Sequence, residues 1–219
     1  MADFDSLFSL FEKNADPSTA QGMSAYMRNQ FSYLGLKTPK RKELSKDFLK
    51  SLKKEKSVNW DFINTCWSNQ YREFKYVAIN YLDYISDLLS PADIVDLKKL
   101  ILAESWWDTI DGLDSIVGRI ALNYPEVNKT LLDWSKNENF WLRRVAIDHQ
   151  NQRKEKTDTD LLEKIIENNL EQQEFFINKA IGWSLREYSK TNPDWVRDFI
   201  RRYRDRLSLL SIREASKYI

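Results

Sequence analysis

Apolar residues recur along this 219-residue chain at intervals of three and four positions, the spacing that places side chains on one face of a helix. Two runs show the pattern clearly: Phe4, Leu7, Phe8 and Phe11 near the beginning, and Leu161, Leu162, Ile165 and Ile166 further on. Residues followed by proline lie between such runs, at 16–17, 38–39, 90–91, 124–125 and 192–193. Because proline is favoured in the first turn of a helix, each pair predicts a turn followed by a helix start.

Turn-forming residues are scarce, because the chain holds only five glycines and five prolines. β-Sandwiches and β-barrels need a turn every few residues, so this composition argues against both. We therefore predict an all-α protein.

A repeat of about 34 residues organises the chain. Small residues recur at spacings of 34, 34, 34 and 35, at Ala78, Gly112, Ala146, Ala180 and Ala215. Five positions before each lies a residue that is bulky and apolar in all but the first case: Glu73, Trp107, Trp141, Phe175 and Leu210. This alternation suits helix pairs that pack closely on their neighbours. It predicts a HEAT-like, armadillo-type α-helical repeat solenoid with a concave face, forming one domain over 1–219, with atypical N-terminal helices at 1–56 and repeats at 57–219.

Some positions of the repeat hold polar residues. Asp111 lies one position before the small residue of its unit, and Arg144 lies two positions before the small residue of the next unit. Stacked repeats bring equivalent positions together, so we expect Asp111 and Arg144 to be close in space although they are 33 residues apart in the sequence. A plain salt bridge between repeats would explain the pair as well as a functional site would, and the sequence leaves both interpretations open.

Residues 105–118 concentrate further unusual features. Trp107 and Asp111 lie four positions apart, on one face of a helix. Asp108, Asp111 and Asp114 follow at intervals of three, which suggests a divalent metal, but nothing supplies the remaining oxygen ligands and we expect no metal. A hydrolase with paired carboxylates would need a partner for Asp111, and the sequence offers no clear one.

Gly182 and Trp183 are consecutive residues within another strongly helical segment. Gly182 costs about 1 kcal/mol there relative to alanine, which indicates a close packing contact or space left for another group. Trp183 follows directly. A tryptophan in a helix usually belongs to the core, but a Gly-Trp pair one or two repeats from Trp107 also fits a binding surface.

The charges are balanced in total, with 34 basic and 33 acidic residues, but they are unevenly distributed. Residues 28–56 hold ten Lys or Arg and three Asp or Glu, and residues 176–219 hold ten and five. Residues 83–134, between them, hold four and ten. The local distribution decides what a surface attracts, so the near-neutral total does not exclude a nucleic-acid partner.

The single histidine and single cysteine exclude several kinds of chemistry. His149 and Cys66 cannot supply the ligands of a usual zinc site, and one cysteine cannot form an internal disulfide. Catalysis by a Ser/His or Cys/His pair would depend on His149, for which a solvated or capping role is the simpler interpretation. No apolar run approaches the roughly 20 residues of a membrane span, and residues 1–3 do not resemble the start of a signal peptide. We expect a cytoplasmic protein, in the bacterial cytosol or nucleoid, without a membrane partner.

Three segments resemble the AlkD family of DNA alkylation repair enzymes. They are Ser-Trp-Trp-Asp-Thr-Ile-Asp at 105–111, Trp-Leu-Arg-Arg-Val-Ala-Ile at 141–147, and the longer Phe-Phe-Ile-Asn-Lys-Ala-Ile-Gly-Trp-Ser-Leu-Arg-Glu-Tyr-Ser-Lys-Thr-Asn-Pro at 175–193. Further likeness occurs at 23–31 and 34–39. The resemblance thus follows nearly the whole chain in order.

This resemblance implies a HEAT-like solenoid whose concave, basic face binds duplex DNA. It implies a glycosylase of base excision repair that releases cationic N3- and N7-alkylpurines such as 3-methyladenine and 7-methylguanine. The family works without a metal or other cofactor and without flipping the base into a pocket. We expect the protein to act as a monomer on double-stranded DNA that contains alkylated purines.

The family motifs also imply roles for individual residues. By resemblance, Asp111 is the catalytic carboxylate, Trp107 and Trp183 form an aromatic cleft against the sugar and backbone of the lesion, and Arg144 contacts the DNA backbone. Further candidates for DNA contacts are the residues at the expected N-terminal DNA-binding helix and in the third motif: Lys37, Thr38, Lys42, Lys179, Arg186 and Lys190.

Two other functions stay open. Some relatives on this scaffold lack the N-terminal helix that enters the minor groove, and they bind DNA poorly without excising a base. The corresponding stretch from Leu34 to Lys42 is present here, but its side chains differ from the family form, so a non-catalytic DNA-binding paralogue is one alternative. A protein-interaction solenoid is the other, because helical repeats commonly bind proteins.

Overall fold

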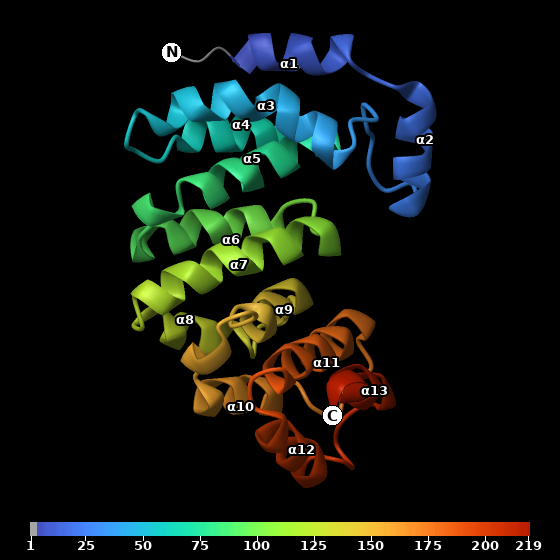
Figure 1. The fold of residues 1–219 in the computed structure, drawn as a ribbon, viewed down its shortest axis with the longest axis vertical. Helices are drawn as coiled ribbons and strands as arrows, with labels where there is room; N and C mark the ends of the chain where they lie inside the picture. The colour runs from blue at the N-terminus through green and yellow to red at the C-terminus, as the bar shows by residue number, and fades with distance from the viewer. Residues whose placement is uncertain (1–3) are drawn as a thin grey trace. The chain divides into compact units, whose positions relative to one another are not determined.

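The computed structural model describes residues 4–219, so residues 1–3, on which the signal-peptide argument rests, lie outside the described residues. Within that range the chain forms thirteen α-helices and no β-strand. The helices are α1 (Phe4–Lys13), α2 (Pro17–Tyr26), α3 (Thr38–Lys53), α4 (Trp60–Ser68), α5 (Arg72–Tyr84), α6 (Ile94–Leu102), α7 (Trp107–Asn123), α8 (Val127–Trp134), α9 (Phe140–Asp148), α10 (Thr159–Glu167), α11 (Phe175–Ser189), α12 (Pro193–Arg202) and α13 (Leu209–Ala215) (Figure 1). The predicted all-α class is confirmed.

Prolines lie at or just before helix starts, as the sequence predicts. Pro17 and Pro193 are the first residues of α2 and α12, and Pro39 is the second residue of α3. Pro91 opens a short 3₁₀ helix, η2 (Pro91–Asp93), that leads into α6, while Pro125 lies in the turn two residues before α8.

The chain divides into two compact units, which meet between Leu89 and Ser90. The first unit contains the N-terminal helices together with the helix pair α4 and α5. This division falls later than the predicted change of organisation near residue 57, because α5 provides the core against which the N-terminal helices pack. The rings of Phe8 and Phe11 on α1 stack on Phe74 of α5, with centroids 5.5 and 5.0 Å apart. The prediction of one domain over 1–219 stays a prediction.

The loop before α3 is fixed by a buried carboxylate on α5. Glu73 is fully buried, and its oxygens accept hydrogen bonds from the backbone N–H groups of Leu34, Gly35 and Leu36 at 2.9 to 3.1 Å. Gly35 has a positive φ of 91°, a conformation that favours glycine. The position of Glu73 in the repeat is otherwise apolar, so this acid replaces a packing residue with an anchor for a loop 37 to 39 residues away in sequence.

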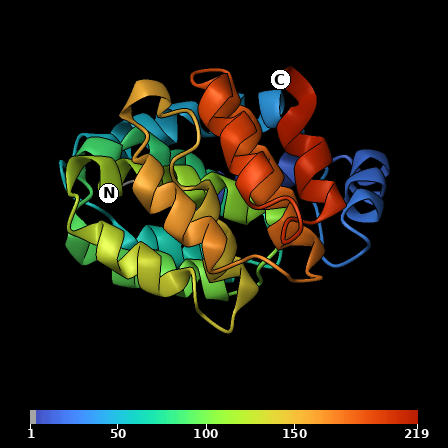
Figure 2. The same cartoon turned by 90° about the horizontal axis from the view of Figure 1, so that it is seen from below.

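The second unit contains the helices α6 to α13 in succession (Figure 1). Its alternate helices pack on one another in order, α7 on α9, α9 on α11 and α11 on α13, while α6 packs on α7 and α8 on α9. Figure 2 shows the C-terminal helices of this unit, coloured orange to red, nearest the viewer. The small residues of the repeat lie on this series and on α5, and Ala78, Ala146, Ala180 and Ala215 are fully buried. The helical-repeat prediction is confirmed.

Two glycines allow neighbouring helices of this series to approach closely. A Cβ on Gly118 of α7 would lie 2.1 Å from the backbone oxygen of His149, at the end of α9. A Cβ on Gly182 of α11 would lie 2.5 Å from the Cβ of Glu214 on α13. Of the two interpretations of Gly182, close packing is therefore the one that the structure supports. Across residues 4–219, every helix is too short or too polar to cross a membrane.

Candidate functional site

The first residues of α7 place Trp107 and Asp111 on one side of the helix. The helix begins at Trp107, after an extended Trp106, and Asp108 lies in its first turn, where a negative charge is favourable to the helix dipole. Asp111 follows one turn later, on the face that Trp107 occupies. Both side chains are partly exposed, and that of Asp111 is 27% accessible. Neither residue is enclosed by the core.

Arg144 of α9 joins Asp111 across the two helices. Its Nε and Nη2 donate hydrogen bonds to Oδ1 of Asp111 at 2.9 and 2.8 Å, and its Nη1 donates to the backbone oxygen of Phe176 at 2.8 Å. The expected proximity of Asp111 and Arg144 is confirmed. Arg144 is only 1% exposed, however, and all three of its nitrogens donate within the protein. The geometry thus favours the ion-pair alternative, and a direct contact of Arg144 with the DNA backbone stays an untested prediction.

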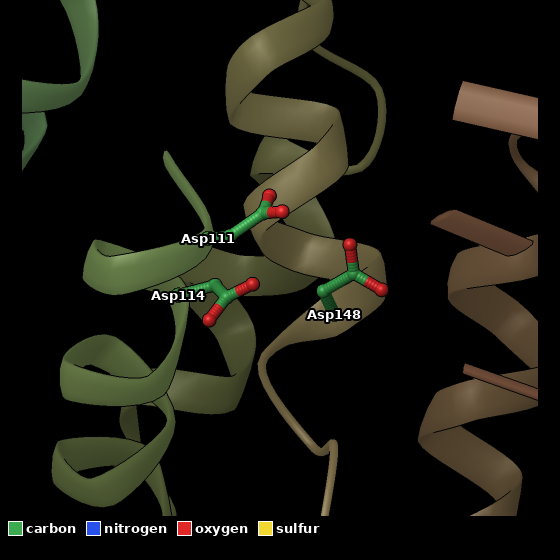
Figure 3. A group of neighbouring side chains, drawn as sticks. All are labelled: Asp111, Asp114 and Asp148. Atoms are coloured by element: carbon green, nitrogen blue, oxygen red, sulfur yellow. The ribbon is translucent and has the colours of Figure 1, made fainter. Parts of the chain in front are cut away.

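Three carboxyl groups gather around this arginine. Asp111, Asp114 and Asp148 each offer an oxygen within 4.8 Å of the others, and Figure 3 shows the two α7 residues projecting toward α9, at whose C-terminal end Asp148 lies. Asp114 and Asp148 are buried, and Oδ2 of Asp148 lies 3.7 Å from Nη2 of Arg144. Asp108, the third member of the sequence series, is not part of this group. The sequence offered no partner carboxylate for Asp111, and the structure provides two.

Burial and mutual repulsion make these acids weaker than usual. Burial raises the pKa of Asp111, and Arg144 opposes this rise by favouring the carboxylate. Burial and the neighbouring Asp148 raise the pKa of Asp114 well above its ordinary value, and burial raises the pKa of Asp148 to about 7. One guanidinium cannot neutralise three carboxylates, so we expect Asp114 to retain its proton at neutral pH, while Asp148 titrates close to neutrality. Asp111, which bonds the arginine directly, is then the member best able to hold a negative charge.

The group is chemically better suited to the arginine than to a metal ion. A divalent cation binds several oxygen ligands without a positive group among them. Here the Arg144 guanidinium already bonds one oxygen of Asp111 and lies beside Asp148. The expectation of no metal therefore stands as a prediction, now with a physical reason.

Trp183 on α11 is a second neighbour of Arg144. The guanidinium carbon of Arg144 is 5.3 Å from the centroid of the Trp183 ring, and Lys179 and Arg186 lie at 5.5 and 5.8 Å from it. The ring is partly exposed. Arg144 thus connects the carboxylate of Asp111 to the aromatic face of Trp183, both of which are accessible from outside the core.

A cluster of aromatic rings supports the N-terminal ends of these helices. Trp106, Trp141 and Phe176 pack with centroids 4.8 to 6.0 Å apart. The starts of α9 and α11 are capped by Asn139 and Glu174, which accept hydrogen bonds from the N–H groups of Trp141 and Phe176. The caps and rings fix the helix ends, and so the positions of Asp111 and Arg144 one turn further along. Trp106, next to Trp107 in sequence, belongs to this packing.

Four further candidates lie on exposed surface or at helix ends. In the first unit, Lys37 occupies the N-cap position of α3 without a capping hydrogen bond from its side chain, and Thr38 and Lys42 belong to the first turns of the helix; all three are exposed. In the second unit, Lys190 caps the end of α11 and pairs with Glu187. The remaining two candidates, Lys179 and Arg186, share one partner that the sequence did not indicate. Both form ion pairs with the carboxylate of Glu214.

His149 has a different environment from the predicted solvated one. It is the C-cap residue of α9 and is only 3% exposed, with Nδ1 lying 2.6 Å from the backbone oxygen of Ala146. Burial lowers its pKa to about 3, so the ring stays neutral at physiological pH. The solvated interpretation is wrong, and the capping one is correct.

Sequence reasoning missed Asp148 and Glu214. Asp148 follows Arg144 by four residues and therefore shares its helical face, a signal that was available in the spacing. Glu214 occupies the same position of the repeat as Asp111, one residue before the small one. Its partners come from a neighbouring helix, so only the fold identifies them.

Comparisons with known proteins agree with this architecture. The sequence model of the family described as DNA alkylation repair enzyme matches residues 8–219. A protein from Enterococcus faecalis, described as a predicted DNA alkylation repair enzyme, is 38% identical; the match covers 94% of this chain and 96% of that one, with a TM-score of 0.86.

A more distant structure shares the fold. AlkD2 from Streptococcus mutans is 17% identical over 78% of this chain and 87% of its own, with a TM-score of 0.61. No curated protein matches the sequence. The family model and the Enterococcus relative both extend over nearly the whole chain, as the resemblance of the motifs predicted. The chain belongs to the family of DNA alkylation repair enzymes.

Proposed function

We propose that this protein is a DNA glycosylase that hydrolyses the N-glycosidic bond of cationic N3- and N7-alkylpurines in duplex DNA. The substrates include 3-methyladenine and 7-methylguanine, and the reaction initiates base excision repair in the cytoplasm. Membership of the repair family supports action on DNA. The observation that carries the finer proposal is the partly exposed carboxylate of Asp111, held by two hydrogen bonds from a buried arginine that also lies 5.3 Å from the ring centroid of the partly exposed Trp183.

The residue types suit this reaction. A purine alkylated at N3 or N7 already bears a positive charge and leaves as a neutral base, so no general acid is needed. The sugar develops oxocarbenium character as the bond breaks, and a fixed carboxylate stabilises that charge or positions the attacking water. Asp111 has this role in the proposal. Both of its arginine bonds end on Oδ1, so Oδ2 takes part in neither and is the oxygen proposed to face the sugar.

Trp107 and Trp183 would provide the aromatic surface against the lesion. The face of an indole ring attracts cations, by about 0.5 to 2 kcal/mol for each contact. Arg144 bonds Asp111 and lies over Trp183, so it would hold the carboxylate and the ring in a fixed position relative to each other. We assign Arg144 a positioning role within the site.

Basic residues and one threonine would hold the phosphate backbone. The candidates are the exposed Lys37, Thr38 and Lys42 at the start of α3, the partly exposed Lys179 and Arg186 on α11, and Lys190 at its end. The N-terminal end of α3 is suited to an anion, because it lacks an acidic residue in its first turn and carries the partial positive charge of the helix dipole. We propose that the protein needs no cofactor and works as a monomer.

The test is release of 7-methylguanine and 3-methyladenine from methylated duplex DNA. We expect release by the native protein and a loss of about 10²- to 10³-fold in the single-turnover rate of Asp111→Asn, because this substitution keeps the size of the side chain and removes its charge. Asp133→Asn, an exposed change of equal charge on α8, serves as the matched control and should leave the rate unchanged.

Other results would support the two alternatives. A native protein that binds duplex DNA and releases no base would be the non-catalytic paralogue. A native protein that does not bind DNA would favour the protein-interaction solenoid.

A further inference from the structure

Glu214 on α13 collects three cations on one buried carboxylate. Lys179 lies 2.8 Å from Oε1, and Arg186 and Lys217 lie 3.0 and 2.7 Å from Oε2. The side chain of Glu214 is only 4% exposed, whereas its three partners are 23, 25 and 46% exposed. The acid therefore lies beneath the cations, which face outward.

Two of these cations also contact the aromatic ring of the candidate site. Lys179 and Arg186 lie 5.5 and 5.8 Å from the centroid of the Trp183 ring. Lys179 is four residues before Trp183 and Arg186 is three residues after it on α11, so they border the ring along the helix. Lys217 binds Glu214 from the short 3₁₀ helix after α13. Lys179 and Arg186 thus link the buried acid to the exposed face of Trp183.

The packing of α13 on α11 holds this acid in place. The Cβ of Glu214 lies where a side chain at Gly182 would be, and Oγ of Ser211 donates a hydrogen bond to the backbone oxygen of Asn178 at 2.8 Å. Lys179 and Lys217 lower the pKa of Glu214 to about 2 through hydrogen bonds, so the carboxylate is charged throughout the physiological range. A fixed negative charge therefore lies directly below the row Lys179, Trp183 and Arg186.

Glu214 holds the same repeat position as Asp111, but it cannot have the same role. Asp111 has 27% of its side chain exposed and Glu214 has 4%, so a substrate cannot reach Glu214. Any effect of Glu214 on a substrate must pass through its partners.

We propose that Glu214 is a positioning residue of the DNA-binding surface. In the unbound protein it holds Lys179 and Arg186 on either side of Trp183, and in the complex it shares these two cations with DNA phosphates. This inference rests on the proposed function. Loss of the Glu214 charge frees the cations, which then neutralise more phosphate charge but no longer present the ring in a fixed geometry. Binding to undamaged DNA and the rate of base release therefore change in opposite directions.

The first experiment compares Glu214→Gln with Glu171→Gln, an exposed change of the same charge whose partner is Arg206. For undamaged duplex DNA, we expect Glu214→Gln to steepen the slope of log affinity against log salt by about 0.9 for each phosphate gained. In single turnover, base release should slow by about tenfold or more, because small displacements in a site are costly. The control should change neither quantity. A purely structural role would lower affinity and rate together, and that result, or no change in either, would overturn the proposal.

A second measurement monitors the environment of the Trp183 ring in the protein without DNA. In protein labelled with 5-fluorotryptophan, Trp183→Phe assigns one ¹⁹F resonance among those of the eight tryptophans. We expect Glu214→Gln to shift this resonance and Glu171→Gln to leave it in place. If Glu214→Gln melts below the assay temperature, Glu214→Asp keeps the charge, withdraws it by one methylene, and should produce an intermediate shift.

The three measurements test the glycosylase function and the positioning role of Glu214 separately. A native protein that releases no base contradicts the proposed function, while the salt slope and the ¹⁹F resonance still test Glu214. An unchanged Trp183 resonance in the Glu214 variants overturns the positioning role even if the native protein is an active glycosylase.

Discussion

At the scale of single residues, Arg144 connects the parts of the candidate site. It is nearly inaccessible, yet it bonds Asp111, lies beside Asp148 and covers one side of Trp183. Burial favours its loss of charge, but Asp148 and Asp111 outweigh this effect and raise its pKa. A permanently charged arginine among buried acids is costly to remove, because its partners then lack a counterion.

Replacement of Arg144 should alter the pH dependence of the reaction. Protonation of Asp111 removes its charge, so the rate falls as the pH drops through the pKa of that carboxyl. Arg144 lowers this pKa, and its absence raises it. We therefore expect Arg144→Met to move the acid limb of the single-turnover rate profile to higher pH and to reduce the plateau rate by about tenfold or more. The salt slope of DNA binding should stay unchanged, because the side chain is buried.

The neighbouring Arg143→Met is the matched control for this prediction. Arg143 is partly exposed and bonds Gln172, so the same loss of charge should leave the acid limb in place. A thermal melt shows whether Arg144→Met is folded, and Arg144→Lys provides a milder change. If Arg144→Met instead makes the slope of log affinity against log salt shallower by about 0.9, the arginine contacts a DNA phosphate directly.

At the scale of helices, stability depends on how closely α7 and α9 approach. Gly118 allows the contact with the end of α9, and an added Cβ would lie 2.1 Å from a backbone oxygen that cannot move aside easily. We expect Gly118→Ala to lower the free energy of unfolding by about 3 kcal/mol, despite the better helix propensity of alanine. Gly22 on α2 has no atom within 4 Å of such a Cβ, so Gly22→Ala should be neutral or stabilising by up to about 1 kcal/mol. Urea unfolding measures both values. Equal stabilities for the two variants would contradict the role of Gly118.

The helices themselves could be predicted, because the residues that specify each helix lie within or next to it in the sequence. Apolar spacing, proline positions and the small residue of each repeat all act within a turn or two of the chain. The pair Asp111 and Arg144 could be predicted as well, since one repeat period relates their positions. Asp148 could have been predicted from its four-residue spacing from Arg144. Glu73 and Glu214 could not be assigned partners in the same way. Glu73 replaces a residue that is apolar in the other repeats, Glu214 shares the repeat position of Asp111, and the groups that bind both acids are set by how the segments pack.

At the scale of the whole molecule, the distribution of charge matters more than its near-zero sum. The segment 28–56, which contains α3, is strongly basic, and the segment 83–134 is acidic. Affinity for DNA depends on the number of phosphates that are neutralised, so only some of the lysines should affect it. The position of a lysine within these segments is therefore expected to determine its contribution.

Lysines at the start of α3 test this expectation. We expect Lys37→Ala and Lys42→Ala each to make the slope of log affinity against log salt shallower by about 0.9, because each would remove one phosphate contact. Lys129→Ala, an exposed change within the acidic segment, should leave the slope unchanged. Fluorescence anisotropy with an undamaged duplex, repeated over a series of salt concentrations, gives the three slopes. A uniform effect of all three substitutions would show that total charge, rather than this surface, drives binding.

The anchor provided by Glu73 also has a consequence during synthesis. The N-terminus leaves the ribosome first, so residues 34–36 emerge 37 or more positions ahead of Glu73, the acid that accepts hydrogen bonds from their N–H groups. At about 5–20 residues per second, that interval is roughly 2 to 7 seconds. Throughout this time the loop that determines where α3 begins lacks its acceptor. The N-terminal segment of the nascent chain can therefore reach its final form only after α5 has left the ribosome.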